Sequence, residues 1–233
     1  MSLRILHVLD HSIPLHSGYT FRTLSILREQ HQRGWETVQL TTPKHGVSGE
    51  REQVVDGMTF HRTPRTEGAG LLAQMQLTAR RLAEVVDATR PDLIHAHSPV
   101  LNALPSLWVG RRKRLPVVYE MRASWEDAAV DHGTTSEGSM RYRISRALES
   151  FALRRADQIT TICEGLKADI AVRGISEDRI TVIPNAVDAA LFRFGVAPDP
   201  ELRRKLGLDG ATVVGFAGSF YGYEGLNLLL EAA

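Results

Sequence analysis

The feature that most constrains this chain is the alternation of short apolar runs with longer amphipathic segments. The runs at residues 4–9, 37–41, 93–95, 117–121, 158–162 and 180–183 predict buried strands. Helical spacing between them predicts helices at 19–33, 71–89, 100–112, 140–155 and 164–173. Strands that alternate with helices favour a parallel sheet joined by right-handed crossovers. The expected fold is therefore α/β, a doubly wound Rossmann-like domain.

Two segments interrupt this alternation. Residues 43–63 contain the pair Asp56-Gly57 between β-rich pieces, which predicts a hairpin turn. Residues 123–138 are rich in Asp, Gly, Thr and Ser, and we expect a polar loop there. Gly34 follows the helix predicted at 19–33 and is expected to end it.

The character of the sequence changes after Pro184. Residues 185–211 are rich in loop-forming residues, and an apolar strand at 212–217 and a helix at 226–233 follow. A strand and part of a helix cannot bury a core of their own. We therefore expect a Rossmann-like domain at 1–184, a linker at 185–211, and the truncated start of a second domain at 212–233.

Composition excludes several kinds of site and partner. The chain has 28 basic and 27 acidic residues, so its charge gives no reason to expect a nucleic-acid partner. Its one cysteine, Cys163, cannot form an internal disulfide or a multi-cysteine zinc site, and it fits a reducing compartment. Neither a signal peptide nor an apolar run of membrane-spanning length is visible, so a cytoplasmic location is expected.

The loop after the first strand argues against two common nucleotide-binding classes. Residues 10–20 contain one glycine, Gly18, instead of a G-x-G-x-x-G pattern, and no acidic residue ends the second strand. A nicotinamide-dependent oxidoreductase is therefore disfavoured. The G-x-x-x-x-G-K-[ST] pattern of P-loop proteins is also absent from the sequence.

Five runs along the sequence carry recognisable motifs. They are the strand, loop, helix and strand at 4–42, PDLIHAHSP at 91–99, ADQITTICEGLKADI at 156–170, ITVIPNAVDAALF at 180–192, and VVGFAGSFYGYEGLNLLLEAA at 213–233. In this order they resemble the motifs of glycosyltransferase family 4, a group of retaining enzymes with the GT-B fold. Cys163 and Ala186 stand where the family usually has serine and glycine. Residues 9–23 further resemble the exosortase-associated glycosyltransferases of bacterial exopolysaccharide clusters.

The resemblance implies a retaining transferase that moves a sugar from a nucleotide-diphosphate sugar to a glycan or lipid-linked acceptor. It implies no metal and no cofactor besides that donor, whose leaving diphosphate helps to deprotonate the acceptor. The family's Glu-x7-Glu stretch, which grips the donor sugar, is absent from residues 1–233. This chain is thus expected to be the inactive N-terminal half of a GT-B enzyme. A non-catalytic α/β binding module and a nucleotide-sugar epimerase remain alternatives.

Two candidate site residues lie at predicted strand ends, where ligands bind in open α/β sheets. His97, in HAHSP, matches the family's histidine that faces the reacting sugar, and we predict it to be catalytic; the alternative is a histidine satisfied in the core. His95 is assigned a structural role. Arg122 suits an anionic substrate, and the alternative is an ion pair with Glu120, Glu126 or Asp127.

The remaining candidates are substrate-binding positions beside the expected cleft. Gly18 lets the backbone approach a ligand at a helix start, and Tyr19 follows it. Asn185, in PNAVD, and Gly218, in FAGSF, lie where the resemblance places the cleft floor and the donor diphosphate; local turns are the alternative. The arginine-rich helix at 140–155 is either an ordinary solvated face or a peripheral contact with the inner membrane.

Overall fold

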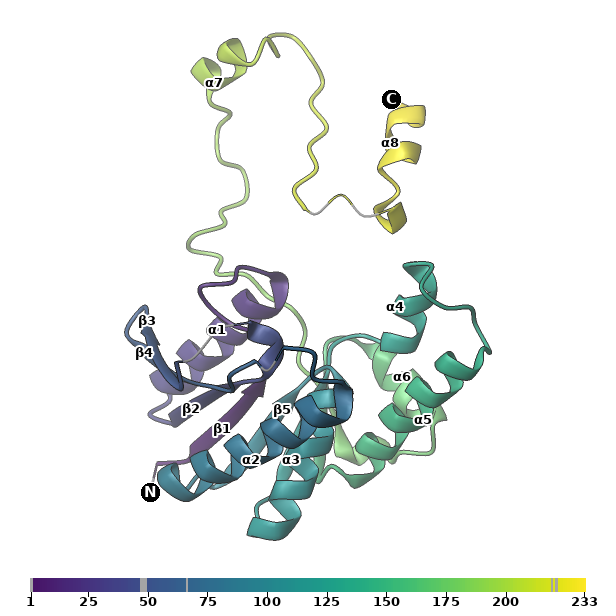
Figure 1. The fold of residues 1–233 in the computed structure, drawn as a ribbon. Helices are drawn as coiled ribbons and strands as arrows, with labels where there is room; N and C mark the ends of the chain where they lie inside the picture. Colours follow the sequence, from purple (N-terminus) through teal and green to yellow (C-terminus); the bar gives the residue numbers. More distant parts are fainter. Residues whose placement is uncertain (1, 47–49, 66, 219, 221) are drawn as a thin grey trace. The chain divides into compact units, whose positions relative to one another are not determined.

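The computed structural model describes residues 2–46, 50–65, 67–218, 220 and 222–233. The chain divides into two compact units, Met1–Asn185 and Ala186–Ala233 (Figure 1). The first unit contains the whole sheet, and the second contains the short helices α7 (Pro200–Lys205) and α8 (Leu226–Ala232).

The first unit is built on one eight-stranded sheet with the order β3-β4-β2-β1-β5-β6-β7-β8. Its strands are β1 (Arg4–Leu9), β2 (Glu36–Thr41), β3 (Glu52–Val55), β4 (Met58–Arg62), β5 (Leu93–His97), β6 (Val117–Met121), β7 (Gln158–Thr161) and β8 (Ile180–Val182). Every neighbouring pair is parallel except β3 and β4, which form the predicted hairpin around Asp56-Gly57. The predicted α/β, doubly wound parallel fold is confirmed.

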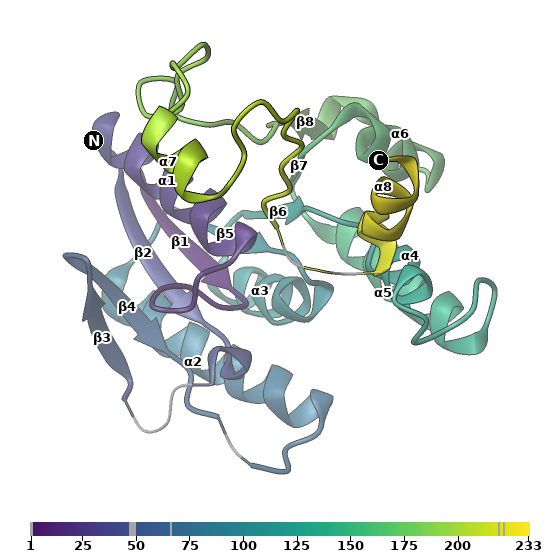
Figure 2. The ribbon, with the colours of Figure 1, turned by 90° about the horizontal axis from the view of Figure 1, so that it is seen from above.

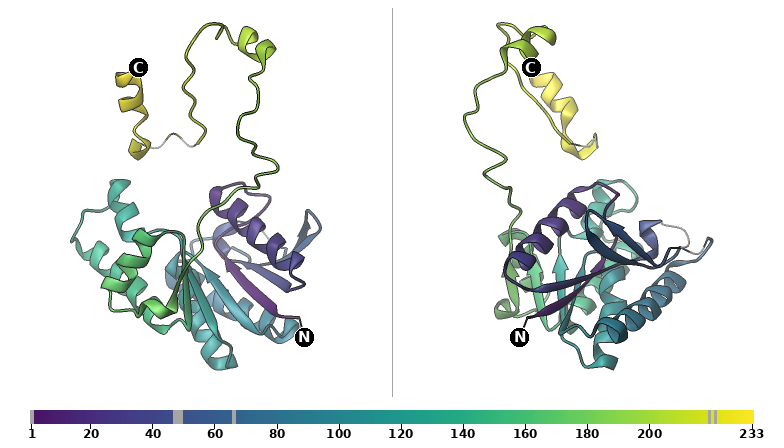
Figure 3. Two further views of the ribbon diagram at one scale, coloured as in Figure 1. Left: turned by 180° about the vertical axis from the view of Figure 1, so that it is seen from behind. Right: turned by 90° about the vertical axis from the view of Figure 1, so that its left-hand side faces the viewer.

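Helices cover both faces of this sheet unequally. They are α1 (Gly18–Gln32), α2 (Leu71–Thr89), α3 (Val100–Lys113), α4 (Trp125–Asp131), α5 (Met140–Arg155) and α6 (Glu164–Val172). The chain steps from β1 to β2 and β4 toward one edge of the sheet, and after α2 it crosses to β5 and continues through β6, β7 and β8 toward the other edge. Right-handed crossovers in opposite directions place α1 on the face opposite α2 and α3 (Figures 2 and 3). Gly34, with φ of 74°, follows the end of α1 as predicted.

The two faces of the central strands differ in chemistry because successive side chains point to opposite sides of a sheet. Leu6, Val8 and Ile94 pack with α2 and α3 in an apolar core. The alternate positions hold His7, His95, His97 and Glu120, all buried. The sheet therefore has a polar layer on the face that α1 covers.

Three sequence predictions need correction. Residues 123–138 contain the helix α4, which Glu126 anchors by an ion pair with Arg173 at 2.6 Å, a contact distant in sequence. The predicted linker contains α7, where the Asp199 side chain accepts from the backbone N–H groups of the first turn. The segment 212–217 is not a strand, since no other strand lies among the described residues of its unit to pair with it.

Candidate functional site

The candidate site lies at the carboxyl ends of β1, β5 and β6, beside the start of α1. The direction of the crossovers reverses between β1 and β5, and ligands of open α/β sheets bind at such a switch point. The N-terminus of α1 also lies at this edge, with Ser17 as its cap. Backbone N–H groups at a helix start favour a negatively charged group.

Glu120 is the centre of the site. Its Oε1 accepts from Arg22 Nη2 at 2.7 Å, and its Oε2 accepts from Arg122 Nε at 2.8 Å. Burial alone would raise the pKa of this carboxyl, but His97 and Arg122 hold the pKa well below its usual value. One buried carboxylate thus serves two guanidinium groups, which leaves the cluster with a surplus positive charge.

His97 is 1% exposed, and both of its ring nitrogens face protein groups. Nδ1 lies 2.5 Å from both Glu120 Oε2 and Arg122 Nη2, and Nε2 lies 2.9 Å from His7 Nδ1. Burial lowers the pKa of His97 to about 3, so the ring is neutral at physiological pH. Direct contact with a substrate hydroxyl would require one ring nitrogen to leave its present partner.

Arg122 is 7% exposed and joins the strand end to α1. Its guanidinium donates to the Tyr19 carbonyl at 3.1 Å and to Thr23 Oγ1 at 3.1 Å, and it lies 5.1 Å from the centre of the Tyr19 ring. Its ion pair is made with Glu120, while the other two acids considered from the sequence, Glu126 and Asp127, have different partners.

Arg22 connects the same cluster to the end of the first unit. It donates to the carbonyls of Ile183 and Pro184 at 2.7 and 3.1 Å, and to Asn185 Oδ1 at 3.1 Å. The structure therefore brings Asn185 to the cluster through Arg22, although 163 residues separate the two.

Tyr19 and Gly18 form the outer part of the site. Burial raises the pKa of Tyr19 to about 12, and its ring lies 6.2 Å from that of Trp125. Gly18 is exposed, and a Cβ added there would meet no atom within 4 Å. Gly218 belongs to Ala186–Ala233, where an added Cβ would come within 2.9 Å of Phe216 Cζ.

His7, His95 and His97 could offer one ligand atom each to a metal ion, since these atoms all lie within 4.8 Å of one another. The His7 and His97 nitrogens are already joined by a hydrogen bond of 2.9 Å. A divalent cation would also lie close to the Arg122 guanidinium, which repels it. This arrangement suits a hydrogen-bonded chain better than a cation.

Two members of the cluster, His7 and Arg22, were not predicted from the sequence, and Glu120 was considered only as an alternative ion-pair partner of Arg122. His7 and Glu120 interrupt the apolar strands RILHVL and VVYEM, and a polar residue inside a buried strand is the informative exception. Arg22 lies one helical turn after Gly18, on the side of α1 that faces the sheet. Only the pairing of distant segments shows that these three side chains meet.

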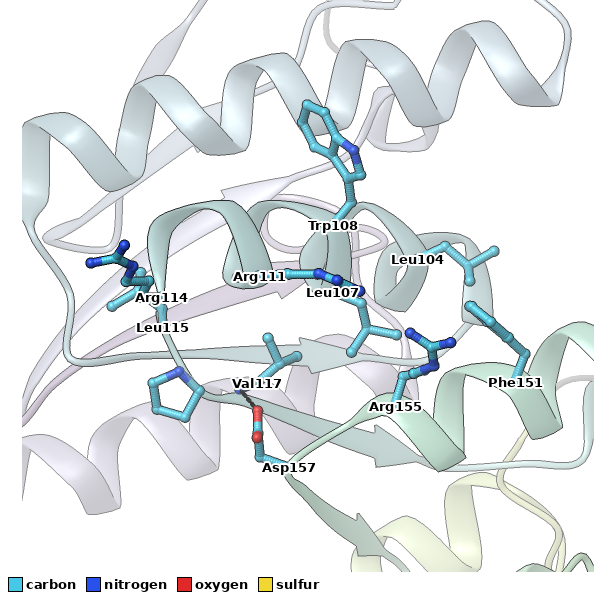
Figure 4. A pocket seen from close by; sticks show the side chains of 12 residues that line it. Leu104, Leu107, Trp108, Arg111, Arg114, Leu115, Val117, Phe151, Arg155 and Asp157 are labelled. Carbon is cyan, nitrogen blue, oxygen red and sulfur yellow. Dashed lines mark hydrogen bonds between the residues drawn. The ribbon is translucent and has the colours of Figure 1, made fainter.

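A separate groove lies between α3 and α5, at the amino ends of β6 and β7 (Figure 4). It has a volume of about 690 Å³, and its apolar lining includes Leu107, Trp108 and Phe151. Arg111, Arg114 and Arg155 also line it, and none of them has an ion-pair partner among the described residues. No helix in the described part of the chain has the length and hydropathy to cross a bilayer.

Gly18 allows a test of ligand approach without a change in packing. We expect Gly18→Ala to keep or raise stability by up to about 1 kcal/mol, because the added methyl meets open space and lowers the entropy of the unfolded chain. Thermal unfolding checks this. If the loop binds a ligand through its backbone, the same variant weakens that ligand's binding while the melting temperature is maintained.

Comparison with known proteins identifies the family of this chain. Residues 17–186 match the family described as the glycosyl transferase 4-like domain. The chain is 29% identical over 197 residues to a 2-deoxystreptamine glucosyltransferase from Streptomyces kanamyceticus, covering 80% of this chain and 50% of that protein. It thus spans about half the length of this relative.

Solved structures show the same fold at low sequence identity. Anabaena Alr3699/HepE in complex with UDP has a TM-score of 0.66 at 18% identity, covering 99% of this chain and 57% of that one. UDP-GlcNAc 2-epimerase from Methanocaldococcus jannaschii has a TM-score of 0.52 at 13% identity, covering 78% and 46%. Because the family match extends over more than half of the chain, this protein belongs to the glycosyl transferase 4-like family of GT-B glycosyltransferases.

Proposed function

We propose that this chain is the acceptor-side half of a retaining glycosyltransferase of bacterial polysaccharide synthesis, in the exosortase-associated group. It transfers a sugar from a nucleotide-diphosphate sugar to a glycan or lipid-linked acceptor, with no cofactor besides the donor. The observation that carries the proposal is the buried cluster of Arg22, Glu120, Arg122 and His97 at the switch point of a glycosyltransferase-family domain. The Anabaena relative, whose structures hold UDP and UDP-glucose, supports a nucleotide sugar as donor.

The charge of the cluster suits the proposed reaction. Departure of a nucleoside diphosphate leaves negative charge on its oxygens, and preorganised guanidinium groups stabilise such charge in a water-poor site. Arg22 and Arg122 share one carboxylate, so the site has cationic charge to spare. The acceptor oxygen forms its bond to the anomeric carbon on the same face from which the bond to the diphosphate breaks, and the leaving diphosphate takes the acceptor proton. The configuration is thus retained without an enzyme nucleophile.

The proposed substrate contacts are Gly18, Tyr19, Arg122 and Asn185 in the first unit, and Gly218 in the second. His97 is the proposed catalytic residue. In the structure its two ring nitrogens contact Arg122 and His7. Contact with a sugar hydroxyl therefore requires the hydroxyl to replace one of these two partners. In this proposal residues 212–233 begin the donor-binding domain, and the residues that bind the donor sugar belong to the rest of that domain.

The deciding experiment is a transferase assay on the intact gene product, extended beyond codon 233, with a panel of nucleotide sugars. We expect transfer with retained anomeric configuration, and His97→Ala is expected to lower kcat/KM at least about tenfold. A kcat/KM within about twofold of wild type would remove His97 from the mechanism. The 233-residue chain alone is expected to show no turnover and little nucleotide-sugar binding.

Two rival functions give different outcomes in that assay. A nucleotide-sugar epimerase, favoured by the similar fold of the Methanocaldococcus enzyme, would convert the donor without any acceptor. A binding module would leave the donor unchanged. Micromolar binding of a UDP-sugar to the 233-residue chain by calorimetry would contradict the proposed location of the donor site.

A peripheral contact with the cytoplasmic face of the inner membrane is part of the proposal. The groove between α3 and α5 combines the exposed side chains of Trp108 and Phe151 with Arg111, Arg114 and Arg155, which have no carboxylate partner among residues 2–46, 50–65, 67–218, 220 and 222–233. This combination suits anionic lipid headgroups. We expect the chain to sediment with phosphatidylglycerol-containing vesicles at low salt but not with neutral vesicles. Replacing the three arginines by glutamine should abolish this binding, and equal binding to both vesicle types would contradict it.

A further inference from the structure

A chain of hydrogen bonds runs from α1 into the sheet and ends at the charged cluster. Gln30 Oε1 lies 2.9 Å from His7 Nε2, and His7 Nδ1 lies 2.9 Å from His97 Nε2. His7 and His97 are 0% and 1% exposed, so bulk water offers them no alternative partner. The state of each ring in this chain therefore depends on its neighbour.

Each ring carries a single proton. Burial lowers the pKa of both His7 and His97 to about 3, so both are neutral at physiological pH. A neutral imidazole donates from one nitrogen and accepts at the other. Once the direction of one hydrogen bond in the chain is set, the direction of the next one follows.

Two arrangements satisfy the bonds between Gln30, His7 and His97. In the first, both rings carry the proton on Nε2, Gln30 accepts through its oxygen, and His97 Nδ1 accepts from Arg122. In the second, both rings carry it on Nδ1, Gln30 donates through its amide nitrogen, and His97 donates to Glu120. The structure has the oxygen of Gln30 facing His7, which corresponds to the first arrangement.

The charged end of the chain does not select between them. His97 Nδ1 lies 2.5 Å from a group that only accepts, Glu120 Oε2, and 2.5 Å from a group that only donates, Arg122 Nη2. Because these opposing neighbours are equally close, we infer that the Gln30 end selects the arrangement. There one amide atom, Oε1, contacts His7 Nε2.

We propose that His7 and Gln30 are positioning residues that set the tautomer of His97 and thereby direct Arg122. With the Gln30 oxygen at His7, the lone pair of His97 Nδ1 is held ready for the Arg122 guanidinium. That bond and the Glu120 and Tyr19 contacts then fix the orientation of the guanidinium. The reversed chain would give the His97 proton to Glu120 and take one acceptor away from Arg122. The kinetic consequence rests on the proposed transferase function, whereas the tautomer itself does not.

The tautomers can be read directly by long-range 1H–15N correlation spectra of the full 233-residue chain with labelled histidine. We expect Nε2–H on both His7 and His97 in the wild type. Gln30→Glu provides an acceptor only and should keep both tautomers, whereas Gln30→Lys provides a donor only and should reverse both. Gln30→Met offers neither and should give a mixture, and Glu29→Gln, on the exposed side of the same turn, serves as the matched control.

An Nδ1–H signal from His97 in the wild type would overturn the inference, as would the same His97 tautomer in the wild type and in a folded Gln30→Lys. If Gln30→Lys does not fold, Gln30→Met decides, because an unchanged single tautomer there shows that the Gln30 end has no influence.

Kinetics of the intact enzyme complete the test. A residue that orients Arg122 for the transition state should affect kcat more than KM, so we expect Gln30→Lys to lower kcat about tenfold with the donor KM within about twofold. If the wild type has no transferase activity, the proposed function fails while the tautomer result stands. If the wild type shows transferase activity but the His97 tautomer is the same in all Gln30 variants, this inference alone fails.

Discussion

Replacing Glu120 with alanine is expected to lower the free energy of unfolding by about 3–5 kcal/mol, because it removes one partner from a buried ion pair. The side chains of Arg22 and Arg122 are 11% and 5% exposed, so water cannot replace the lost carboxylate. His97 also loses one of the two neighbours of its Nδ1. Urea denaturation monitored by circular dichroism measures the change.

A surface ion pair provides the control for this prediction. Glu36 pairs with Arg4 at 2.6 Å, but the two side chains are 53% and 37% exposed. Glu36→Ala should therefore cost less than about 1 kcal/mol. If Glu120→Ala fails to fold, Glu120→Gln, which keeps an acceptor oxygen, should fold with an intermediate loss. A loss for Glu120→Ala as small as that of Glu36→Ala would show that the buried cluster is not a major source of stability.

Glu149 is expected to make the stability of the chain depend on pH. This α5 side chain is 1% exposed, and its Oε1 accepts from the Tyr119 hydroxyl at 2.6 Å, while its Oε2 has no hydrogen-bond partner in the part of the chain that the structure describes. The pKa of Glu149 is raised from 4.5 to about 7; burial is the largest cause, and the nearby Glu126 contributes to the same rise. The folded state thus favours the protonated acid.

The sign of the effect follows from that shift. A raised pKa contributes stability that is complete below the unfolded value near pH 4.5 and is lost as the pH rises through 7. The full loss is on the order of 3 kcal/mol, from the energy of one pKa unit. Glu149→Gln mimics the protonated acid, so it should match the wild type near pH 4.5 and exceed it in stability at pH 8.

Urea midpoints at pH 4.5, 6 and 8 for the variant and the wild type test this, since other titrating groups cancel in the difference. Glu177→Gln, at an exposed carboxylate, is the control and should leave the pH dependence unchanged. Parallel stability curves for Glu149→Gln and the wild type would contradict the prediction.

The local hydrophobic pattern of the sequence was sufficient to predict most of the fold, but it indicated only some of the residues of the candidate site. The strand β1 was predictable because a strand buried on both faces has a nearly continuous apolar sequence, which only His7 interrupts between Ile5 and Leu9, and α2 was predictable because its apolar spacing is helical. His97 and Arg122 were candidates from the sequence because they lie at the carboxyl ends of β5 and β6, where ligands of open α/β sheets bind. The helix α4 was missed, since its polar sequence is held by Glu126 with Arg173 and by Asp127 with Tyr142.

The sequence by itself determined the α/β class, the parallel sheet and the edge of the sheet at which the candidate residues lie, because hydrophobic periodicity and turn chemistry are local properties. Only the tertiary structure decided that His7, Arg22, Glu120 and Asn185 belong to one cluster with His97 and Arg122. The partners in this cluster come from separate strands, from α1 and from the end of the first unit. Their hydrogen bonds and charges act over a few ångströms in space, a distance that spacing along the chain does not encode.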